Sequence, residues 1–302
     1  MTLAPRAVLV HRRTELQELV ERHGTYGQAE FFLASRGRRL ADVERSHRLV
    51  QDAITAVAAA IPGSWRRGTV ERADLPRFMF EPGDIIVVVG QDGLVANVAK
   101  YLDGQCVIGI NAEPARNPGV LVPHRPRAAA SLLAAAARPG SPVSPLAMVT
   151  ARTDDGQELA ALNEVYIGSP SHQTARYTIA LAGDGLGGEI TEAQASSGVI
   201  VATGTGATGW CRSAWLERHS PLRLPKPTDQ RLAWFVREAW PSPVTGTART
   251  EGELAAGQQL TLTAAADQLV LFGDGVEADA LPLSWGQTVS VSIAPRTLNL
   301  LP

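Results

Sequence analysis

Five branched apolar residues stand in a row at residues 85–89, between Asp84 and Gly90. A strand with one face in water alternates apolar and polar side chains, whereas a strand covered on both faces shows no alternation. The run Ile-Ile-Val-Val-Val therefore predicts a central strand of a parallel sheet. A helical pattern over residues 94–102 and an apolar strand over residues 106–110 complete a strand, helix, strand unit.

The segments before this strand have the same α/β character. Residues 7–10 form a short apolar run, and an apolar face then marks a helix that ends at Gly24. A second helix is expected over residues 42–60, because its partial apolar stripe stops at Pro62-Gly63. The N-terminal part of the chain is thus predicted to be an α/β domain.

The pattern changes after about Pro123. An alanine-rich segment at residues 128–137 predicts a connecting helix, and a series of short strands with turn signals follows. A β-sandwich or a folded antiparallel sheet is typical of such a series. We expect an α/β domain over residues 1–124 and a β-rich, sandwich-like domain over residues 125–302, with the extreme C-terminus able to return to the first domain. The expected strands cover residues 146–151, 158–167, 177–181, 198–203, 260–263, 269–272 and 288–293.

Charge and cysteine content exclude several classes of function. A net charge of -2 and a pI of about 6.3 lack the basic excess of nucleic-acid-binding proteins. Residues 1–10 contain no secretion signal and no apolar run is long enough to span a bilayer, so we expect a cytoplasmic protein without membrane or nucleic-acid partners. Cys106 and Cys211 lie in apolar stretches without metal-ligand spacing, which favours reduced core thiols and no metal held by the protein.

The turn Gly90-Gln91-Asp92-Gly93 is the first candidate for chemistry. It joins the buried strand to a helix, and backbone N–H groups at such a junction favour phosphate oxygens. The carboxylate of Asp92 repels phosphate, but it suits a base for a hydroxyl or an indirect magnesium partner. The alternative is an ordinary Asp-Gly turn.

Residues 203–210, Thr-Gly-Thr-Gly-Ala-Thr-Gly-Trp, form the second candidate, which we call the threonine loop. Three hydroxyls, three glycines and an aromatic ring are suited to gripping a nucleotide. The spacing Gly204-x-Gly206-x-x-Gly209 also matches the dinucleotide fingerprint, but prolines replace the strand and acidic residue expected about twenty positions on. A dehydrogenase and a plain turn remain as alternatives.

Two further polar groups interrupt apolar strands. The pair Asn163-Glu164 is disfavoured inside a strand, which suggests that it reads an adenine or nicotinamide amide edge or a ribose hydroxyl. A solvent-facing edge strand is the alternative. Gly273-Asp274-Gly275 has the composition of a tight hairpin turn.

In this order, the segments resemble the NAD kinase family and, more broadly, the superfamily that includes diacylglycerol and sphingosine kinases. The matched family motifs are Gly-Gly-Asp-Gly-Thr, Gly-Ile-Asn, Asn-Glu, Thr-Pro-Thr-Gly-Ser-Thr-Ala-Tyr and a late Asp-Gly. They are similar to residues 90–94, residues 109–111, Asn163-Glu164, the threonine loop and Asp274-Gly275.

The resemblance implies a kinase that moves a phosphoryl group from ATP or another polyphosphate donor to a hydroxyl of NAD or another small acceptor, in a cleft between the domains. Asp92 would act as the base, Mg²⁺ would offset the triphosphate charge, and the protein would form homodimers or homotetramers. The implied nucleotide and phosphate ligands are Gly90, Gln91, Gly93, Leu94, Thr203, Thr205, Gly206 and Thr208, and those of the acceptor are Asn163, Glu164, Gly209, Trp210 and Ser197.

The chain departs from the family motifs at several of these positions. Gln91 replaces a glycine, Leu94 a threonine, Gly204 a proline and Trp210 a tyrosine, and Ser197 stands where the family has an aspartate. Acceptor recognition is therefore expected to differ. A kinase of another small alcohol, such as a sugar or nucleoside, and a nucleotide-binding regulator without turnover are the alternatives to an NAD kinase.

Overall fold

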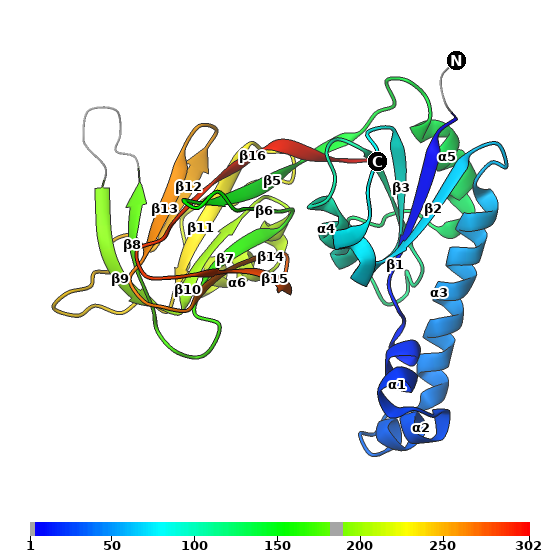
Figure 1. The fold of residues 1–302 in the computed structure, drawn as a ribbon, viewed down its shortest axis with the longest axis horizontal. Coiled ribbons are helices and arrows are strands. Elements are labelled where there is room, and N and C mark those ends of the chain that lie inside the picture. Colours follow the sequence, from blue (N-terminus) through cyan, green and yellow to red (C-terminus); the bar gives the residue numbers. More distant parts are fainter. Residues whose placement is uncertain (1–3, 182–189) are drawn as a thin grey trace. The chain divides into compact units, whose positions relative to one another are not determined.

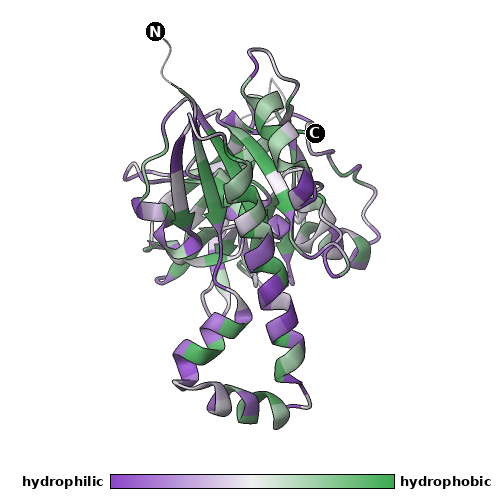
Figure 2. Ribbon diagram, turned by 90° about the vertical axis from the view of Figure 1, so that its right-hand side faces the viewer, coloured by the Kyte–Doolittle hydropathy of each residue, from purple (hydrophilic) through white to green (hydrophobic). Residues whose placement is uncertain are grey.

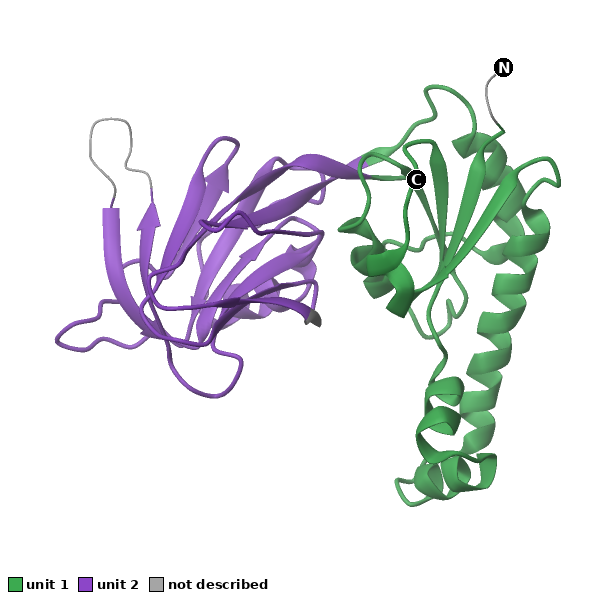
Figure 3. Ribbon diagram, in the orientation of Figure 1, with its two compact units in different colours: residues 1–144, 299–302 green, residues 145–298 purple. Residues whose placement is uncertain are grey.

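The computed structural model describes residues 4–181 and 190–302. The chain divides into two compact units, coloured separately in Figure 3. Unit 1 comprises Met1–Ser144 with Asn299–Pro302, and unit 2 comprises Pro145–Leu298. The division lies later than the 124/125 boundary expected from the sequence, because the alanine-rich helix α5 (Ala129–Ala136) packs in the core of unit 1.

Unit 1 is built around a parallel sheet (Figure 1). Its strands lie in the order β2 (Arg66–Glu71), β1 (Arg6–His11), β3 (Asp84–Gly90) and β4 (Cys106–Asn111). All three pairings between them are parallel. The last residues of β16 (Thr288–Leu300) add a short parallel pairing to β4. The α/β character predicted for this part of the chain is confirmed.

The apolar run of β3 explains its central place in the sheet. Ile85, Val87 and Val89 pack in a core that includes Ala53 and Val57 of α3 (Leu40–Ala60). The intervening residues 86 and 88 are fully buried as well. Because both faces of the strand are covered, it has no position for a polar side chain between its ends.

A helical projection extends from unit 1, as Figures 1 and 2 show. It consists of α1 (Glu15–His23), α2 (Tyr26–Ala34) and the first part of α3. The helix α1 ends at Gly24, as expected from the sequence, whereas α2 was not expected. The projection has an apolar core of its own, formed by Leu16, Leu19, Ala29, Leu33 and Val43.

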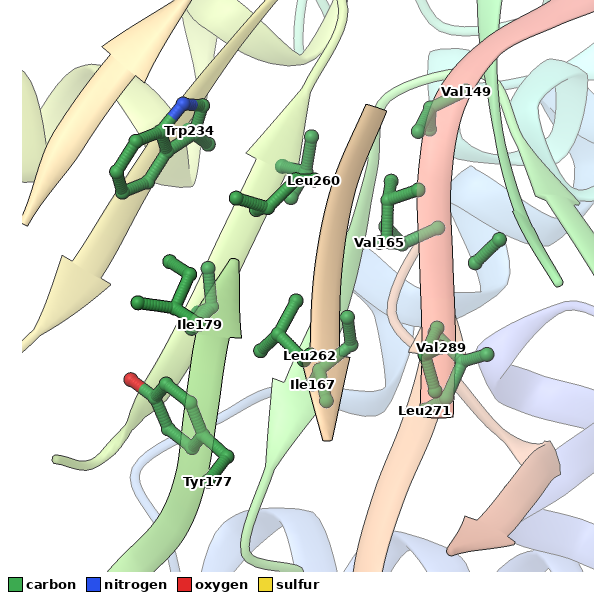
Figure 4. Packing of buried hydrophobic residues seen from close by; sticks show 14 of the residues in the cluster. Val149, Val165, Ile167, Tyr177, Ile179, Trp234, Leu260, Leu262, Leu271 and Val289 are labelled. Carbon is green, nitrogen blue, oxygen red and sulfur yellow. The ribbon is translucent and has the colours of Figure 1, made fainter. Parts of the chain in front are cut away.

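Unit 2 contains two sheets that enclose a common apolar core (Figure 4). The first is antiparallel, in the order β12-β11-β10-β7-β14-β15, and the second contains β5, β6, β8, β9, β13 and most of β16. The β-rich, sandwich-like domain predicted from the sequence is confirmed. The strands are β5 (Ser144–Thr153), β6 (Glu158–Ala161), β7 (Glu164–Gly168), β8 (Ala175–Leu181), β9 (Ile190–Ser196), β10 (Gly198–Ala202), β11 (Arg231–Arg237), β12 (Glu251–Ala255), β13 (Gln259–Ala264), β14 (Leu269–Gly273) and β15 (Val276–Leu283).

One expected strand is two strands in the structure. Residues 158–167 were predicted as a single strand, but β6 and β7 belong to different sheets, and the chain crosses between the sheets at Leu162 and Asn163. The helix predicted over residues 94–102 is also shifted, because α4 covers Asp92–Ala99. Within the described residues, no helix is both long and apolar enough to cross a membrane.

Candidate active site

The crossing at Leu162 and Asn163 is held by a carboxylate from a distant hairpin. Asp274 and Gly275 form the two-residue turn between β14 and β15, with φ values of 54° and 64°. The Asp274 carboxylate accepts hydrogen bonds from the backbone N–H of Leu162 at 2.9 Å and from that of Asn163 at 2.7 Å. The late Asp-Gly turn therefore shapes the backbone at the Asn163-Glu164 pair.

Thr203, the first residue of the threonine loop, also binds the backbone at the sheet crossing of Leu162 and Asn163. Its backbone N–H donates to the Asn163 carbonyl at 2.9 Å, and its hydroxyl donates to the Leu162 carbonyl at 2.6 Å. The hydroxyl also accepts from the N–H groups of Thr205 and Gly206 at 3.1 and 3.3 Å. Since a hydroxyl donates once and accepts twice, the Thr203 hydroxyl is fully used inside the protein and positions the loop.

Two glycines of the threonine loop are required by close backbone packing. A Cβ atom on Gly206 would lie 2.2 Å from the Asn163 carbonyl oxygen, and one on Gly204 would lie 1.9 Å from that of Lys226. Real Cβ atoms do not approach so closely, so both positions exclude side chains. The contact with Lys226 leaves no room at position 204 for a residue with a Cβ, and proline is such a residue.

The strand before the threonine loop does not have the setting of a dinucleotide fingerprint. The strand β10 pairs antiparallel with β7 on one side and with β11 on the other. The fingerprint requires a parallel strand, helix, strand unit with the glycines at the helix N-terminus. The glycine spacing at residues 204–209 therefore has no support as a dehydrogenase motif.

The threonine loop keeps polar groups for a ligand. The Thr205 hydroxyl is buried and has no hydrogen-bond partner among the residues that the structure describes. Such an atom is rare unless a water or ligand completes its bonding. Thr208 is exposed, and its hydroxyl donates to the Thr205 carbonyl at 3.0 Å, which leaves its two acceptor sites open. Gly209 is exposed beside it.

Glu164 is a half-buried acid with a shifted pKa. Burial raises the pKa of Glu164 to about 7, and the negative charge of Asp274 adds to the increase. Cys211, in α6 (Trp210–Glu217), lies close enough that the charge of Glu164 adds to the effect of burial, which raises the Cys211 pKa to about 12. At neutral pH the Glu164 carboxyl is therefore present in both protonation states.

Trp210 belongs to an aromatic group with Tyr166 and Phe272 that was not expected from the sequence. Its ring is stacked on Tyr166, with centroids 5.4 Å apart, and the Arg237 guanidinium lies 4.9 Å from its centroid. Tyr166 also contacts Phe272 at 5.0 Å, and its hydroxyl donates to the Ser197 carbonyl. Tyr166 thus connects Trp210 with Ser197.

Gly168 and Gly198 provide a sequence signal for this arrangement. A Cβ on either glycine would lie within 3 Å of the Tyr166 ring, so both are required beside it. Ser197 itself precedes β10 and Thr203 follows it, so the five residues of the strand lie between them and separate the two by about 20 Å. Through Tyr166 the structure connects Ser197 with Trp210, the last residue of the threonine loop, but not with Thr203 at the start of the loop.

In unit 1, the Asp92 carboxylate binds backbone N–H groups of the segment after β4. Its Oδ1 accepts from Leu121 at 2.7 Å and from Val122 at 3.1 Å, and its Oδ2 accepts from Val120 at 3.0 Å. A Cβ on Gly109 of β4 would lie 1.9 Å from the Leu121 carbonyl oxygen, so this segment packs directly on the sheet. Asp92 therefore holds the backbone of residues 120–122 in place.

The other residues of the Gly90 to Leu94 turn differ in exposure. Leu94 is 5% exposed and its side chain packs against Gly90, and its N–H donates to the Gln91 carbonyl at 2.9 Å. Leu94 thus belongs to the core of unit 1. Gln91 and Gly93 are exposed, and α4 begins at Asp92, so the first N–H groups of this helix have no preceding helical carbonyl to bind.

No group of three or more His, Cys, Asp or Glu side chains that could hold a metal ion occurs among the described residues. Magnesium commonly binds proteins through substrate phosphates and only one or two carboxylates. The side chains here fit an ion that arrives with a nucleotide better than one held in a protein cage.

Comparisons with known proteins identify a solved structure of similar fold. No protein-family model matches the chain, and none of the curated proteins matches it. Among solved structures, an NAD kinase from Archaeoglobus fulgidus in complex with ATP superposes with a TM-score of 0.58 at 17% sequence identity. The alignment covers 98% of this chain and 93% of the other. At this identity the similarity establishes an NAD kinase-like fold.

Proposed function

We propose that this protein is a kinase that transfers a phosphoryl group from ATP or another polyphosphate donor to a hydroxyl of NAD or another small acceptor. The observation that carries the proposal is the convergence of three distant motifs on one point. Asn163-Glu164, the threonine loop and Asp274 are joined by direct hydrogen bonds around the sheet crossing. Their order along the chain is that of the family motifs, and the fold is NAD kinase-like.

The groups assigned to bind the donor phosphates are backbone N–H groups and threonine hydroxyls. In unit 1 these are the first N–H groups of α4 at Asp92 and Gly93, since a helix N-terminus favours phosphate. In unit 2 they are the hydroxyls of Thr205 and Thr208, of which the first is buried without a partner in the described structure. Magnesium carried by the nucleotide would reduce the charge of its phosphates.

Asp92 is assigned as the general base. Its two oxygens accept three backbone hydrogen bonds, and a carboxylate has about four acceptor sites, so one site on Oδ2 has no donor among the residues that the structure describes. The acceptor hydroxyl would give its proton to this site while its oxygen attacks the terminal phosphorus. The bond between that phosphorus and the bridging oxygen breaks, and the shortened donor leaves with the bridging oxygen.

The acceptor is assigned to Asn163 and Glu164. Both side chains are half-buried, and neither forms a hydrogen bond with any residue that the structure describes. An amide together with a carboxyl that titrates near neutral pH can pair with ribose hydroxyls or with an amide edge. NAD offers both groups and is the first acceptor to test, followed by nucleosides and sugars.

A specific observation favours a second candidate, a nucleotide-binding regulator without turnover. The Asp92 oxygens already hold residues 120–122, and Leu94 buries its side chain where the family motif has a threonine. Both features preserve the turn as a structural element whether or not it transfers phosphate. Binding of ATP and NAD without product would identify this case.

The test is to incubate the purified full chain with magnesium, ATP and a panel of NAD, NADH, nucleosides and sugars, and to measure ADP and phosphorylated acceptor. We expect phosphorylation of at least one panel member. The same preparations are titrated calorimetrically with ATP and NAD. Tight binding without turnover would replace the kinase by the regulator, and absence of both binding and turnover would refute both candidates.

A further inference from the structure

A second polar site lies in unit 2, on the segment that leads from α6 to β11. A cavity of about 440 Å³ is lined there by Arg223, Lys226, Asp229, Gln230 and Arg231. We call it the Arg223 pocket. Three of its five lining side chains are cationic and one is acidic.

The direction of Arg223 follows from the packing of its neighbours. Leu222 and Leu224 pack in the apolar cluster beneath α6, and the indole N–H of Trp215 donates to the Leu222 carbonyl at 2.8 Å. Arg223 lies between two inward-facing residues and is exposed, as is Lys226. The backbone of this segment is therefore anchored while its cations face the cavity.

The acidic side chains Asp229 and Glu253 pair with Arg231 of the pocket. Arg231 pairs with Glu253 at 2.8 Å and with Asp229 at 3.5 Å. Asp229 also accepts from the backbone N–H of Lys226 at 2.9 Å. Neither Arg223 nor Lys226 forms a salt bridge with a carboxylate in the described part of the chain, although the pKa of Asp229 is lowered chiefly by the backbone hydrogen bond from Lys226, and the charge of Lys226 contributes.

The wall of the pocket is joined to the threonine loop. The Lys226 carbonyl lies against Gly204, where a Cβ would come within 1.9 Å. The next carbonyl, that of Pro227, accepts from the N–H of Ala147 in β5 at 2.8 Å. Backbone contacts on both sides therefore hold the pocket in a fixed position beside the loop.

We propose that the Arg223 pocket binds the phosphate groups of a small molecule that carries two or three phosphates. Arg223 supplies the planar, multidentate donor that phosphate oxygens favour, and Lys226 supplies a point charge beside it. The phosphates belong either to the nucleotide held by the neighbouring threonine loop or to a separate phosphorylated ligand. The proposal concerns binding alone and does not require turnover.

The test uses inorganic triphosphate as the probe and the full chain without any acceptor. Calorimetric titration of the wild type is compared with Arg223→Ser/Lys226→Ser. The matched control is Arg212→Ser, which removes an exposed arginine of unit 2 outside the pocket. We expect the double variant to weaken triphosphate binding at least about tenfold and the control variant to bind like the wild type. Circular dichroism checks that the variants are folded.

Titrations in saturating ATP identify the source of the phosphates. If ATP displaces triphosphate and itself binds more weakly to the double variant, the pocket takes the nucleotide's own phosphates. If triphosphate and ATP bind together, the pocket takes a separate ligand.

The proposal is overturned if the wild type does not bind triphosphate, if the double variant binds it equally well, or if Arg212→Ser weakens binding as much. A failure of the kinase assay with this pattern intact would refute the kinase alone.

Discussion

The backbone N–H of Leu121 donates a hydrogen bond of 2.7 Å to Oδ1 of Asp92. Together with the bonds from Val120 and Val122, this bond gives the Asp92 carboxylate a structural role in addition to the proposed catalytic role. The two roles have different chemical requirements. A structural acceptor needs oxygen lone pairs in fixed positions, whereas a base must also take up a proton.

The variant Asp92→Asn distinguishes the catalytic role of Asp92 from its structural role. The amide keeps one oxygen acceptor but cannot serve as the base, so we expect turnover to fall at least about 100-fold. The free energy of unfolding should fall by only about 1–2 kcal/mol, from the weakened backbone hydrogen bonds. Asp52→Asn, on the exposed side of α3, is the matched control and should change neither quantity. Wild-type turnover in Asp92→Asn would remove Asp92 as the base.

Gly206→Ala tests the packing of the threonine loop on Asn163. The added Cβ would lie 2.2 Å from a backbone carbonyl oxygen, so the loop or the sheet crossing must move. We expect a loss of about 1–3 kcal/mol in unfolding free energy, measured by urea denaturation. Gly27→Ala in α2 is the control, because no atom lies within 4 Å of its Cβ position. It should be neutral or stabilise the protein by up to about 1 kcal/mol. Equal stability of the two variants would contradict the packing described here.

Glu164 gives a pH dependence of stability with a defined sign. Its pKa rises from 4.5 to about 7 in the folded protein, so between these values the folded state binds more protons than the unfolded state. Stability is therefore expected to fall as the pH rises from about 4.5 to about 7, by up to about 3 kcal/mol, and to level off above.

Glu164→Gln should remove this contribution. We expect it to be more stable than the wild type at pH 8 and close to it at pH 5, with Glu217→Gln, an exposed acid of α6, as the control. Urea unfolding followed by tryptophan emission is suitable, since five of the six tryptophans lie in unit 2. Parallel pH profiles of wild type and Glu164→Gln would rule out the buried-acid assignment.

The variant Asp274→Asn changes the hairpin residue that binds the backbone of Leu162 and Asn163. It removes the negative charge that adds to the raised Glu164 pKa, while burial, the larger cause, stays. The pH above which stability levels off should therefore decrease relative to the wild type. Asn also has one carbonyl oxygen for two backbone donors, at a cost of about 1–3 kcal/mol. An unchanged profile would mean that the charge of Asp274 does not act on Glu164.

The sequence was most informative where one local rule determines the structure. The run of branched residues at 85–89 predicted a strand buried on both faces, and Gly24 predicted the end of α1. The residue pair Asp274-Gly275 predicted a hairpin turn, because both residues tolerate positive φ. In each case the preference of the segment agrees with its tertiary surroundings.

The rest depends on contacts between distant segments. Nothing local to residues 158–167 indicates that the chain changes sheets at Leu162, since the bonds that fix the crossing come from Thr203 and Asp274. The helix α2 was missed because Phe31 is exposed while Leu33 is buried, so its apolar residues do not define one face. The strand β11 had a usable signal in the sequence, the five consecutive apolar residues Leu-Ala-Trp-Phe-Val after Arg231.

The return of residues Asn299–Pro302 to unit 1 has a consequence for synthesis of the protein. The whole of unit 2 is translated before the segment that pairs with β4, so the sheet of unit 1 stays incomplete while the ribosome makes the following 150 or so residues. Until then the Cys106–Val107 end of β4 is unpaired on this side, whereas the Gly109–Asn111 end already binds His124, and the unpaired end can pair with another chain. Truncation before Asn299 is therefore expected to produce aggregation that begins at β4, even though unit 2 is intact.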